Sequence, residues 1–117
     1  MKTLKMMPDY ECWALWAIED WGPDNIDPAT LPLDAPTVAD LNQWAETFTQ
    51  TLNRDDPAES GFDSQQEFER FEKRGLRLWQ RLQGQLAPNY RVKYQSLAYS
   101  TLFDTPEEWE RVTNSRT

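Results

Sequence analysis

The feature that most constrains the fold is a hydrophobic stripe at helical spacing between residues 64 and 86. Its apolar side chains recur every three or four positions, the period of one helix face, and are Phe68, Phe71, Leu78, Trp79, Leu82 and Leu86. Asp63 or Ser64 can cap the N-terminus of this helix, and Pro88 ends it. Gly75 lies on the stripe and predicts a close approach by another backbone; the alternative is a tolerated local weakness.

A second amphipathic helix is predicted from Pro36 or Thr37 to near Asn53. One face of it carries Val38, Leu41, Trp44, Ala45, Phe48 and Leu52. Pro57 disfavours helical geometry at the residue before it, so this helix must end before that proline. Thr105-Pro106 resembles a helix start and predicts a short third helix that leads into Trp109.

Period-two alternation predicts a strand over residues 90–96, with Tyr90, Val92 and Tyr94 on one face. We also predict strands over 3–7 and 10–18, a further strand over 97–103, and a long irregular connection over 19–36 that contains four prolines. These elements predict an α+β fold, in which a small, mainly antiparallel sheet has two main helices packed on one face. The length of 117 residues fits a single domain over 1–117.

The residue types exclude several kinds of catalytic and metal site. The chain has no histidine and one cysteine, Cys12, so a Ser-His-Asp triad, a Cys-His nucleophile and a thiolate or imidazole zinc site are excluded. The four glycines are isolated, and no Asp-x-Asp-x-Asp-Gly calcium loop occurs. Oxygen-only cation sites and a carboxylate pair for glycoside hydrolysis stay open in principle, but no candidate stands out. We therefore predict no enzyme activity, no metal and no cofactor.

The N-terminal segment carries no apolar run of signal-peptide length, and no stretch approaches the roughly 18 apolar residues that span a bilayer. We therefore expect a cytoplasmic protein with no membrane partner.

The net charge of −8 is distributed unevenly along the chain. Residues 1–69 carry a net charge of −12, residues 70–96 a net charge of +6, and residues 97–117 a net charge of −2. The basic segment has helical spacing opposite the apolar stripe and contains Arg70, Lys73, Arg74, Arg77 and Arg81. We interpret it as a solvated helix face paired with Glu67, Glu69 and neighbouring loop acids, rather than as a nucleic-acid groove, because the surrounding potential is negative.

Two loops concentrate the acidic side chains, and a tryptophan lies within the first. Three interpretations remain open: a solubilising surface, helix capping by Asp63 and Asp34, and an interface for a basic protein partner. Tryptophan among the acids favours the third interpretation, because tryptophan is enriched at interface hot spots. The candidate partner-binding residues are Glu19, Asp20, Trp21, Asp24, Asp27, Asp55, Asp56 and Glu59.

Two motifs together carry a family resemblance: Asn-Ile-Asp-Pro-Ala-Thr-Leu-Pro-Leu over 25–33 and Thr-Leu-Asn-Arg-Asp-Asp-Pro-Ala-Glu-Ser-Gly-Phe over 51–62. With Trp44 between them, and Phe71, Gly75 and Leu82 after them, the chain resembles small acidic immunity proteins of bacterial polymorphic-toxin and contact-dependent growth inhibition systems. The resemblance spans Pro8 to Tyr94, and residues 97–117 depart from it as a C-terminal extension.

The resemblance implies a cytoplasmic protein that binds and neutralises one cognate toxin, often a nuclease, without catalysis of its own. Such a toxin has a basic active cleft that an acidic surface can occupy, so the charge distribution is compatible with this function. The alternative function is a structural or regulatory protein-interaction domain with no toxin partner, in which the acids only confer solubility.

Overall fold

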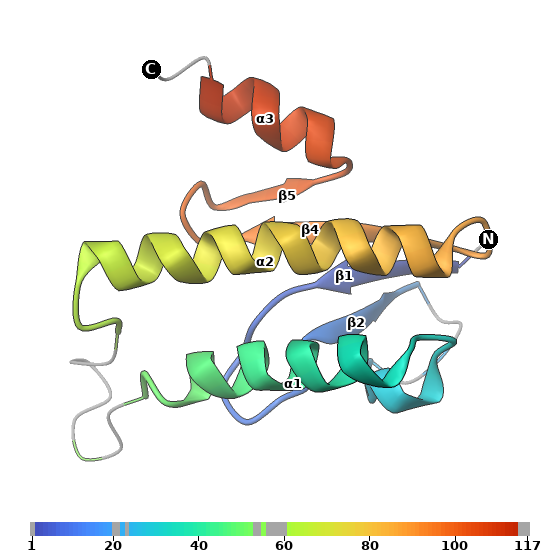
Figure 1. Ribbon diagram of the computed structural model, residues 1–117, viewed down its shortest axis with the longest axis horizontal. Helices are drawn as coiled ribbons and strands as arrows, with labels where there is room; N and C mark the ends of the chain where they lie inside the picture. The colour runs from blue at the N-terminus through green and yellow to red at the C-terminus, as the bar shows by residue number, and fades with distance from the viewer. Residues whose placement is uncertain (1, 20–21, 23, 53–54, 56–60, 115–117) are drawn as a thin grey trace.

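The computed structural model describes residues 2–19, 22, 24–52, 55 and 61–114 (Figure 1). For residues 113 and 114 it describes the backbone only. The elements in these ranges are β1 (Lys2–Met6), β2 (Leu15–Ile18), β3 (Asn25–Ile26), the 3₁₀ turn η1 (Pro28–Thr30), α1 (Ala35–Thr49), α2 (Gln65–Leu86), β4 (Tyr90–Ser96), β5 (Thr101–Phe103) and α3 (Pro106–Asn114). The predicted α+β class, with two main helices and a short C-terminal helix, is confirmed.

The described strands form a single sheet in the order β3-β2-β1-β4-β5. β1 pairs in parallel with β4, and the other neighbouring pairs are antiparallel, as expected for a mainly antiparallel sheet. In Figure 1, α1 and α2 lie side by side over one face of the sheet, and α3 lies beyond β5. The opposite face of the sheet has no helix over it among the described residues.

The alternation of side chains in the two central strands separates a core face from an open face. Leu4 is paired with Val92, and Met6 with Tyr94, and all four side chains are buried beneath the helices. Lys5 lies opposite Lys93 on the other face, where both are half-buried. Burial of the apolar residues on one face fixes the register, because a slip of one residue would bring the lysines into the core.

The centre of the core is built from aromatic side chains of both main helices. Trp44 of α1 is fully buried and stacks on Phe71 of α2, with ring centroids 4.4 Å apart. Its indole Nε1 donates a hydrogen bond to the Phe71 carbonyl at 3.0 Å, and Trp79 Nε1 donates to the Val92 carbonyl at 2.7 Å. These bonds satisfy the indole N–H groups of Trp44 and Trp79, so these two rings add apolar contact area without leaving an unpaired donor.

The close approach predicted at Gly75 is present, but side chains make it rather than a backbone. A Cβ on Gly75 would lie 2.8 Å from Trp44 Cζ2 and 2.9 Å from the hydroxyl oxygen of Tyr94. The glycine therefore leaves the space that the Trp44 indole occupies between the two helices.

A buried carboxylate joins α2 to the end of β4. Glu72 is 5% exposed, and its oxygens accept hydrogen bonds from the Tyr94 hydroxyl at 3.1 Å, the Ser96 hydroxyl at 3.0 Å and the Leu97 N–H at 3.0 Å. A buried charge needs such donors to offset its lost hydration. Glu72 therefore holds the chain as it leaves β4 and turns towards β5.

The strand predicted over residues 10–18 is wrong in its first half, because the described chain turns between residues 9 and 14. The Tyr10 ring stacks on Phe48 of α1 at a centroid distance of 4.7 Å, and Glu11 adopts a left-handed φ of 59°. The Tyr10 ring therefore packs the turn against α1, and only Leu15–Ile18 pairs as a strand.

The irregular connection predicted over 19–36 contains regular structure in its described part, namely the edge strand β3 and η1. The helix that follows begins at Ala35, slightly earlier than predicted, because Asp34 caps it by accepting a hydrogen bond from the Thr37 N–H at 2.8 Å. Hydrogen bonds from Thr37 lower the pKa of Asp34. The helix ends at Thr49 rather than near Asn53, because Thr51 N–H bonds to the Phe48 carbonyl in a tighter turn.

The predicted elements over 64–86 and 90–96 agree closely with α2 and β4. Ser64, one of the two predicted caps, accepts a hydrogen bond from the Glu67 N–H at 3.1 Å. The strand predicted over 97–103 is shorter, since only Thr101–Phe103 pairs with β4. In α3, Trp109 and Val112 pack against the hydrophobic core.

Candidate partner-binding site

The predicted contact residues are only partly within the described chain. Glu19, Asp24, Asp27 and Asp55 belong to it. Asp20, Trp21, Asp56 and Glu59 lie outside the described residues.

Glu19 and Asp24 lie at the same end of the β2–β3 pair. Glu19 directly follows β2 and has a left-handed φ of 73°, and Asp24 directly precedes β3. The Asp24 carbonyl accepts a hydrogen bond from the Ala17 N–H at 2.9 Å, which ties the end of the connection to β2. Both side chains are exposed, so this end of the sheet presents two carboxylates to solvent.

Asp27 has a structural role in addition to its charge. Its carboxylate caps η1 by accepting a hydrogen bond from the Ala29 N–H at 3.0 Å, and its backbone carbonyl accepts one from the Thr30 hydroxyl at 2.7 Å. The side chain is half-buried, whereas Glu19 and Asp24 are exposed. Asp27 is therefore the predicted contact residue whose carboxylate is most clearly committed to the fold.

Asp55 is exposed and lies after α1, whereas η1 packs near the beginning of α1 (Figure 1). A helix of 15 residues such as α1 is about 22 Å long. The structure therefore places the described acids of the two loops at opposite ends of α1 and does not bring them into one cluster. A partner that contacts both loops must also pass along this helix.

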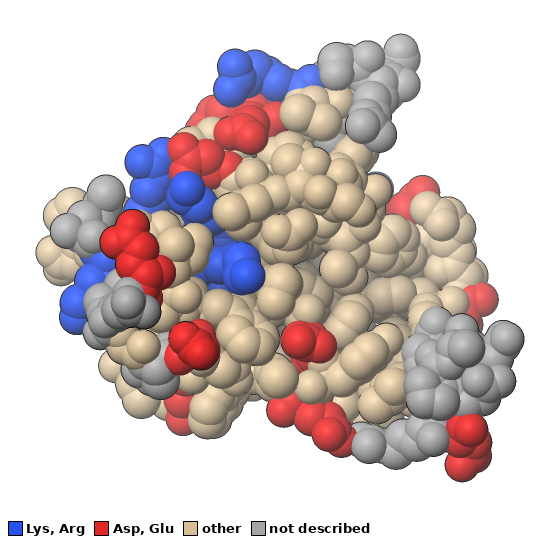
Figure 2. All heavy atoms as spheres, turned by 180° about the vertical axis from the view of Figure 1, so that it is seen from behind, with Lys and Arg blue, Asp and Glu red and all other residues tan. Residues whose placement is uncertain are grey.

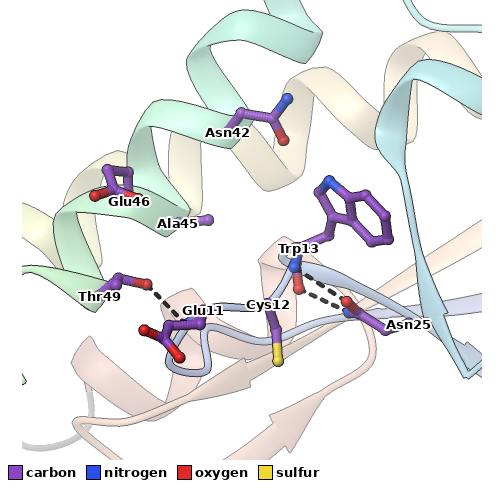
Figure 3. A pocket seen from close by; sticks show the side chains of 8 residues that line it. All are labelled: Glu11, Cys12, Trp13, Asn25, Asn42, Ala45, Glu46 and Thr49. Carbon is purple, nitrogen blue, oxygen red and sulfur yellow. Dashed lines mark hydrogen bonds between the residues drawn. The ribbon is translucent and has the colours of Figure 1, made fainter.

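A groove of about 590 Å³ lies along α1 where the turn between β1 and β2 passes beside the helix (Figure 3). The described residues that line it are Glu11, Cys12, Trp13, Asn25, Asn42, Ala45, Glu46 and Thr49. They come from the turn, from β3 and from the C-terminal half of α1. The groove therefore lies between the two acidic ends.

The turn that forms one wall of the groove is held on both sides. Glu11 N–H donates a hydrogen bond to the Thr49 hydroxyl on α1 at 3.0 Å. The Asn25 amide accepts from the Trp13 N–H at 3.1 Å and donates to the Trp13 carbonyl at 2.8 Å and to the Leu15 carbonyl at 3.1 Å. The Asn25 side chain thus pairs with the turn as a strand backbone would, and it fixes the main chain of Trp13.

Trp13 is exposed although its backbone is fixed. Its side chain is 44% exposed, and in Figure 3 the indole points to the α1 side of the groove whereas the Cys12 sulfur points away from it. Glu11 and Glu46 add two carboxylates, and none of the eight described lining residues is basic. The groove therefore combines an accessible aromatic face with negative charge.

Sequence reasoning missed Trp13, because it placed this residue inside a buried strand. The only local signal was the polar Glu11 and the turn residues Pro8 and Asp9 just before it. The contacts that expose Trp13 come from Asn25 and Thr49, which lie 12 and 36 residues further along the chain.

A base of α2 forms its ion pair with a different acid from those predicted. Arg81 Nη1 forms an ion pair with Asp40 of α1 at 2.8 Å, and Arg81 Nη2 donates to the Thr37 hydroxyl at 2.9 Å. Among the described residues no ion pair joins the α2 bases to Glu67 or Glu69, so that part of the prediction is wrong. The neighbouring helix, rather than the first turn of α2, supplies the partner.

The open face of the sheet carries a second group of bases. Lys5, Arg91 and Lys93 share this face, and Asp104 pairs with Arg91 and lies 3.8 Å from Lys93 Nζ. Figure 2 views the molecule from this side and shows basic side chains gathered at the left and the top, with acidic ones among them and further acidic ones along the lower edge and at the right. The basic side chains are therefore concentrated in one part of this view, whereas the acidic ones are spread over it.

Within the described ranges, no three His, Cys, Asp or Glu side chains are grouped so that they could hold a metal ion. The same part of the chain contains no helix with the length and apolar character needed to cross a membrane.

Comparison with known proteins identifies the family. A family model described as Serratia CdiI immunity protein-like matches residues 2–97, which is most of the chain. The chain belongs to this family. No curated protein matches it.

The family match covers β1 to β4, both main helices, the two acidic loops and the groove. β5 and α3 lie beyond its end at residue 97. The family resemblance inferred from the motifs is thus confirmed.

Proposed function

We propose that this CdiI-like protein is an immunity protein that binds and neutralises a cognate bacterial toxin domain, without catalysis of its own. Membership of the immunity protein-like family carries the proposal. The charge distribution supports it, because an acidic surface complements the basic cleft of a toxin that attacks nucleic acid. On this proposal the toxin is a nuclease, and the protein acts in the cytoplasm without a nucleic-acid or membrane partner.

The proposed contact surface consists of the two acidic loops, whose described acids lie at opposite ends of α1. Its residues are Glu19, Asp20, Trp21, Asp24, Asp27, Asp55, Asp56 and Glu59. Exposure of Glu19, Asp24 and Asp55 supports this assignment, since exposed charges steer a partner and raise the association rate. Asp27 contributes chiefly through the fold of its loop, because its carboxylate caps η1.

The second candidate function is an interaction domain with no toxin partner. One observation favours this function. Asp27, Asp34 and Asp40 each make contacts that stabilise the fold, so part of the acidic excess has a structural role. The two functions differ in whether the protein protects a cell.

Co-expression with the toxin domain encoded by the neighbouring gene separates these functions. We expect cells that carry the toxin alone to stop growing, and cells that carry both proteins to grow and to yield a stable complex on size-exclusion chromatography. A neighbouring toxin that remains lethal and forms no complex with this protein would contradict the immunity function. Turnover of a nucleotide, ester or glycoside substrate by the purified protein would contradict the non-catalytic part.

A further inference from the structure

The groove beside α1 exposes a large aromatic face on a fixed backbone. Trp13 is 44% exposed, while Asn25 bonds to both its N–H and its carbonyl. Tryptophan provides a large contact area, and a fixed main chain lowers the entropy lost when a partner orders it. Such a residue has the properties of an interface anchor.

The charge around Trp13 indicates the chemistry of its partner. Glu11 lies in the turn below the groove and Glu46 on the helix above it, and in Figure 3 both lie to the left of Asn42 and of the Trp13 indole. Ala45 is 5% exposed and provides a small side chain between them. A groove lined by both an aromatic face and carboxylates suits a cation, and a planar guanidinium can stack on an indole while carboxylates attract its charge.

The position of the groove also fits an incoming basic protein. It lies on α1 between the described acids of the two loops, so a partner steered to those acids meets the groove. The loops would supply long-range attraction, and Trp13 the short-range contact.

We infer that the groove receives an arginine side chain of the toxin, with its guanidinium on the Trp13 indole and its charge attracted by the Glu11 and Glu46 carboxylates. This inference rests on the proposed immunity function and specifies how the toxin is held. It adds Trp13, Glu11 and Glu46, which do not belong to the acidic loops, to the proposed contact surface.

The first experiment uses the isolated protein and small probes. N-acetyl-arginine amide is titrated into the labelled protein and followed by NMR at the Trp13 indole N–H and the Asn25 and Asn42 amides. N-acetyl-citrulline amide, of similar shape but uncharged, is the matched control, and N-acetyl-lysine amide tests a simple point charge. We expect shifts at these groups with arginine only, which disappear in Trp13→Ala. Equal shifts with citrulline or lysine, no shifts with arginine, or shifts that persist in Trp13→Ala would overturn the inference.

The second experiment measures toxin affinity. Trp13→Ala should raise the toxin Kd at least about 30-fold, the loss that defines an interface hot spot, while Trp13→Phe retains most of the affinity. Glu46→Gln keeps the shape of the side chain and should raise the Kd about 3- to 10-fold by removing a charge that attracts the guanidinium. The control is Leu102→Ala, because Leu102 is similarly exposed at 41% but belongs to β5. We expect it to leave the Kd within about twofold, as a change outside the contact surface should.

The two experiments separate the possible failures. Tight toxin binding by Trp13→Ala would overturn the inference about the groove and leave the immunity function intact. Absence of toxin binding by the wild-type protein would overturn the immunity function and with it the identity of the occupant, whereas the arginine titration would separately decide the chemistry of the groove.

Discussion

The indole of Trp44 lies so close to Gly75 that a Cβ on the glycine would be 2.8 Å from Trp44 Cζ2. Trp44 cannot move aside easily, because it stacks on Phe71 and donates to the Phe71 carbonyl. We therefore expect Gly75→Ala to lower the free energy of unfolding by about 1–3 kcal/mol through overpacking, although alanine favours helices. Urea unfolding followed by tryptophan fluorescence measures this change.

The same helix provides the matched control. Gly84 has no atom within 4 Å of an added Cβ, so Gly84→Ala should raise the free energy of unfolding by up to about 1 kcal/mol. Equal stabilities for the two variants would show that Trp44 does not restrict the space at Gly75.

Elements whose signals are local were predicted well from the sequence. The stripe from Phe68 to Leu86 has the period of a helix over its whole length, and Ser64 and Pro88 bound it, so α2 was predicted closely. The turn at residues 9–14 was not, since its form depends on Thr49 and Asn25. Composition alone predicts a strand there, because aromatic residues are typical of strands, whereas in the structure Tyr10 packs on α1 and Trp13 is exposed.

The buried Tyr94 predicts a loss of stability at alkaline pH. Burial raises the pKa of Tyr94 above its ordinary value of 10.0, and the neighbouring Glu72 carboxylate raises it further. Above pH 10 the unfolded chain loses this proton while the folded protein retains it, so the folded state is favoured less as the pH rises. We expect the unfolding free energy of wild type to fall by about 1.4 kcal/mol per pH unit more steeply than that of Tyr94→Phe.

The measurement is a series of urea unfolding curves for both proteins between pH 9 and 12. Tyr94→Phe also leaves Glu72 with one donor fewer, so we expect it to be about 1–2 kcal/mol less stable at neutral pH. The lysines and arginines are common to both proteins, and their titration cancels in the comparison. Parallel pH profiles would mean that Tyr94 ionises alike in the folded and unfolded chains.

The Asn25 amide should be the main support of the exposed Trp13. Asn25→Ala removes three hydrogen bonds to the backbone of Trp13 and Leu15, and we expect it to cost about 1–2 kcal/mol of stability. The amide hydrogen of Trp13 should also exchange faster with solvent, because its acceptor is gone. Asn42→Ala is the control, since this exposed side chain lines the same groove from α1 and should change stability by less than about 0.5 kcal/mol. If the Trp13 amide hydrogen exchanges no faster in either variant, other contacts must hold the turn rigid.

Of the candidate site, the sequence predicts only where the charged side chains lie along the chain. Counting acids located the loops that contain Glu19, Asp24 and Asp55. That the loops lie at opposite ends of α1, and that Trp13 lies exposed between them, follows from tertiary packing. Glu72 is a further example. In the sequence it cannot be distinguished from a surface glutamate, because its burial depends on the turn after β4.

Charge reversal separates the contribution of the two acidic loops to toxin association. The double variants Glu19→Lys with Asp24→Lys, and Asp55→Lys with Asp56→Lys, each leave a net charge of −4, starting from −8. Each should lower the association rate constant about 10-fold at low salt, because the attraction that steers a basic toxin is removed. The rate should also depend less on salt, since screening then has less attraction to weaken. Stopped-flow measurements at several salt concentrations give both quantities.

The matched control reverses two acids of α3, Glu107→Lys with Glu110→Lys, which produces the same net charge outside the family match. If local charge at the loops steers the toxin, this control should retain most of the wild-type rate and salt dependence. Equal slowing by all three double variants would assign steering to net charge alone. A loss confined to one loop would place the toxin at that end of α1, and unchanged kinetics in both loop variants would exclude the acidic loops as the contact surface.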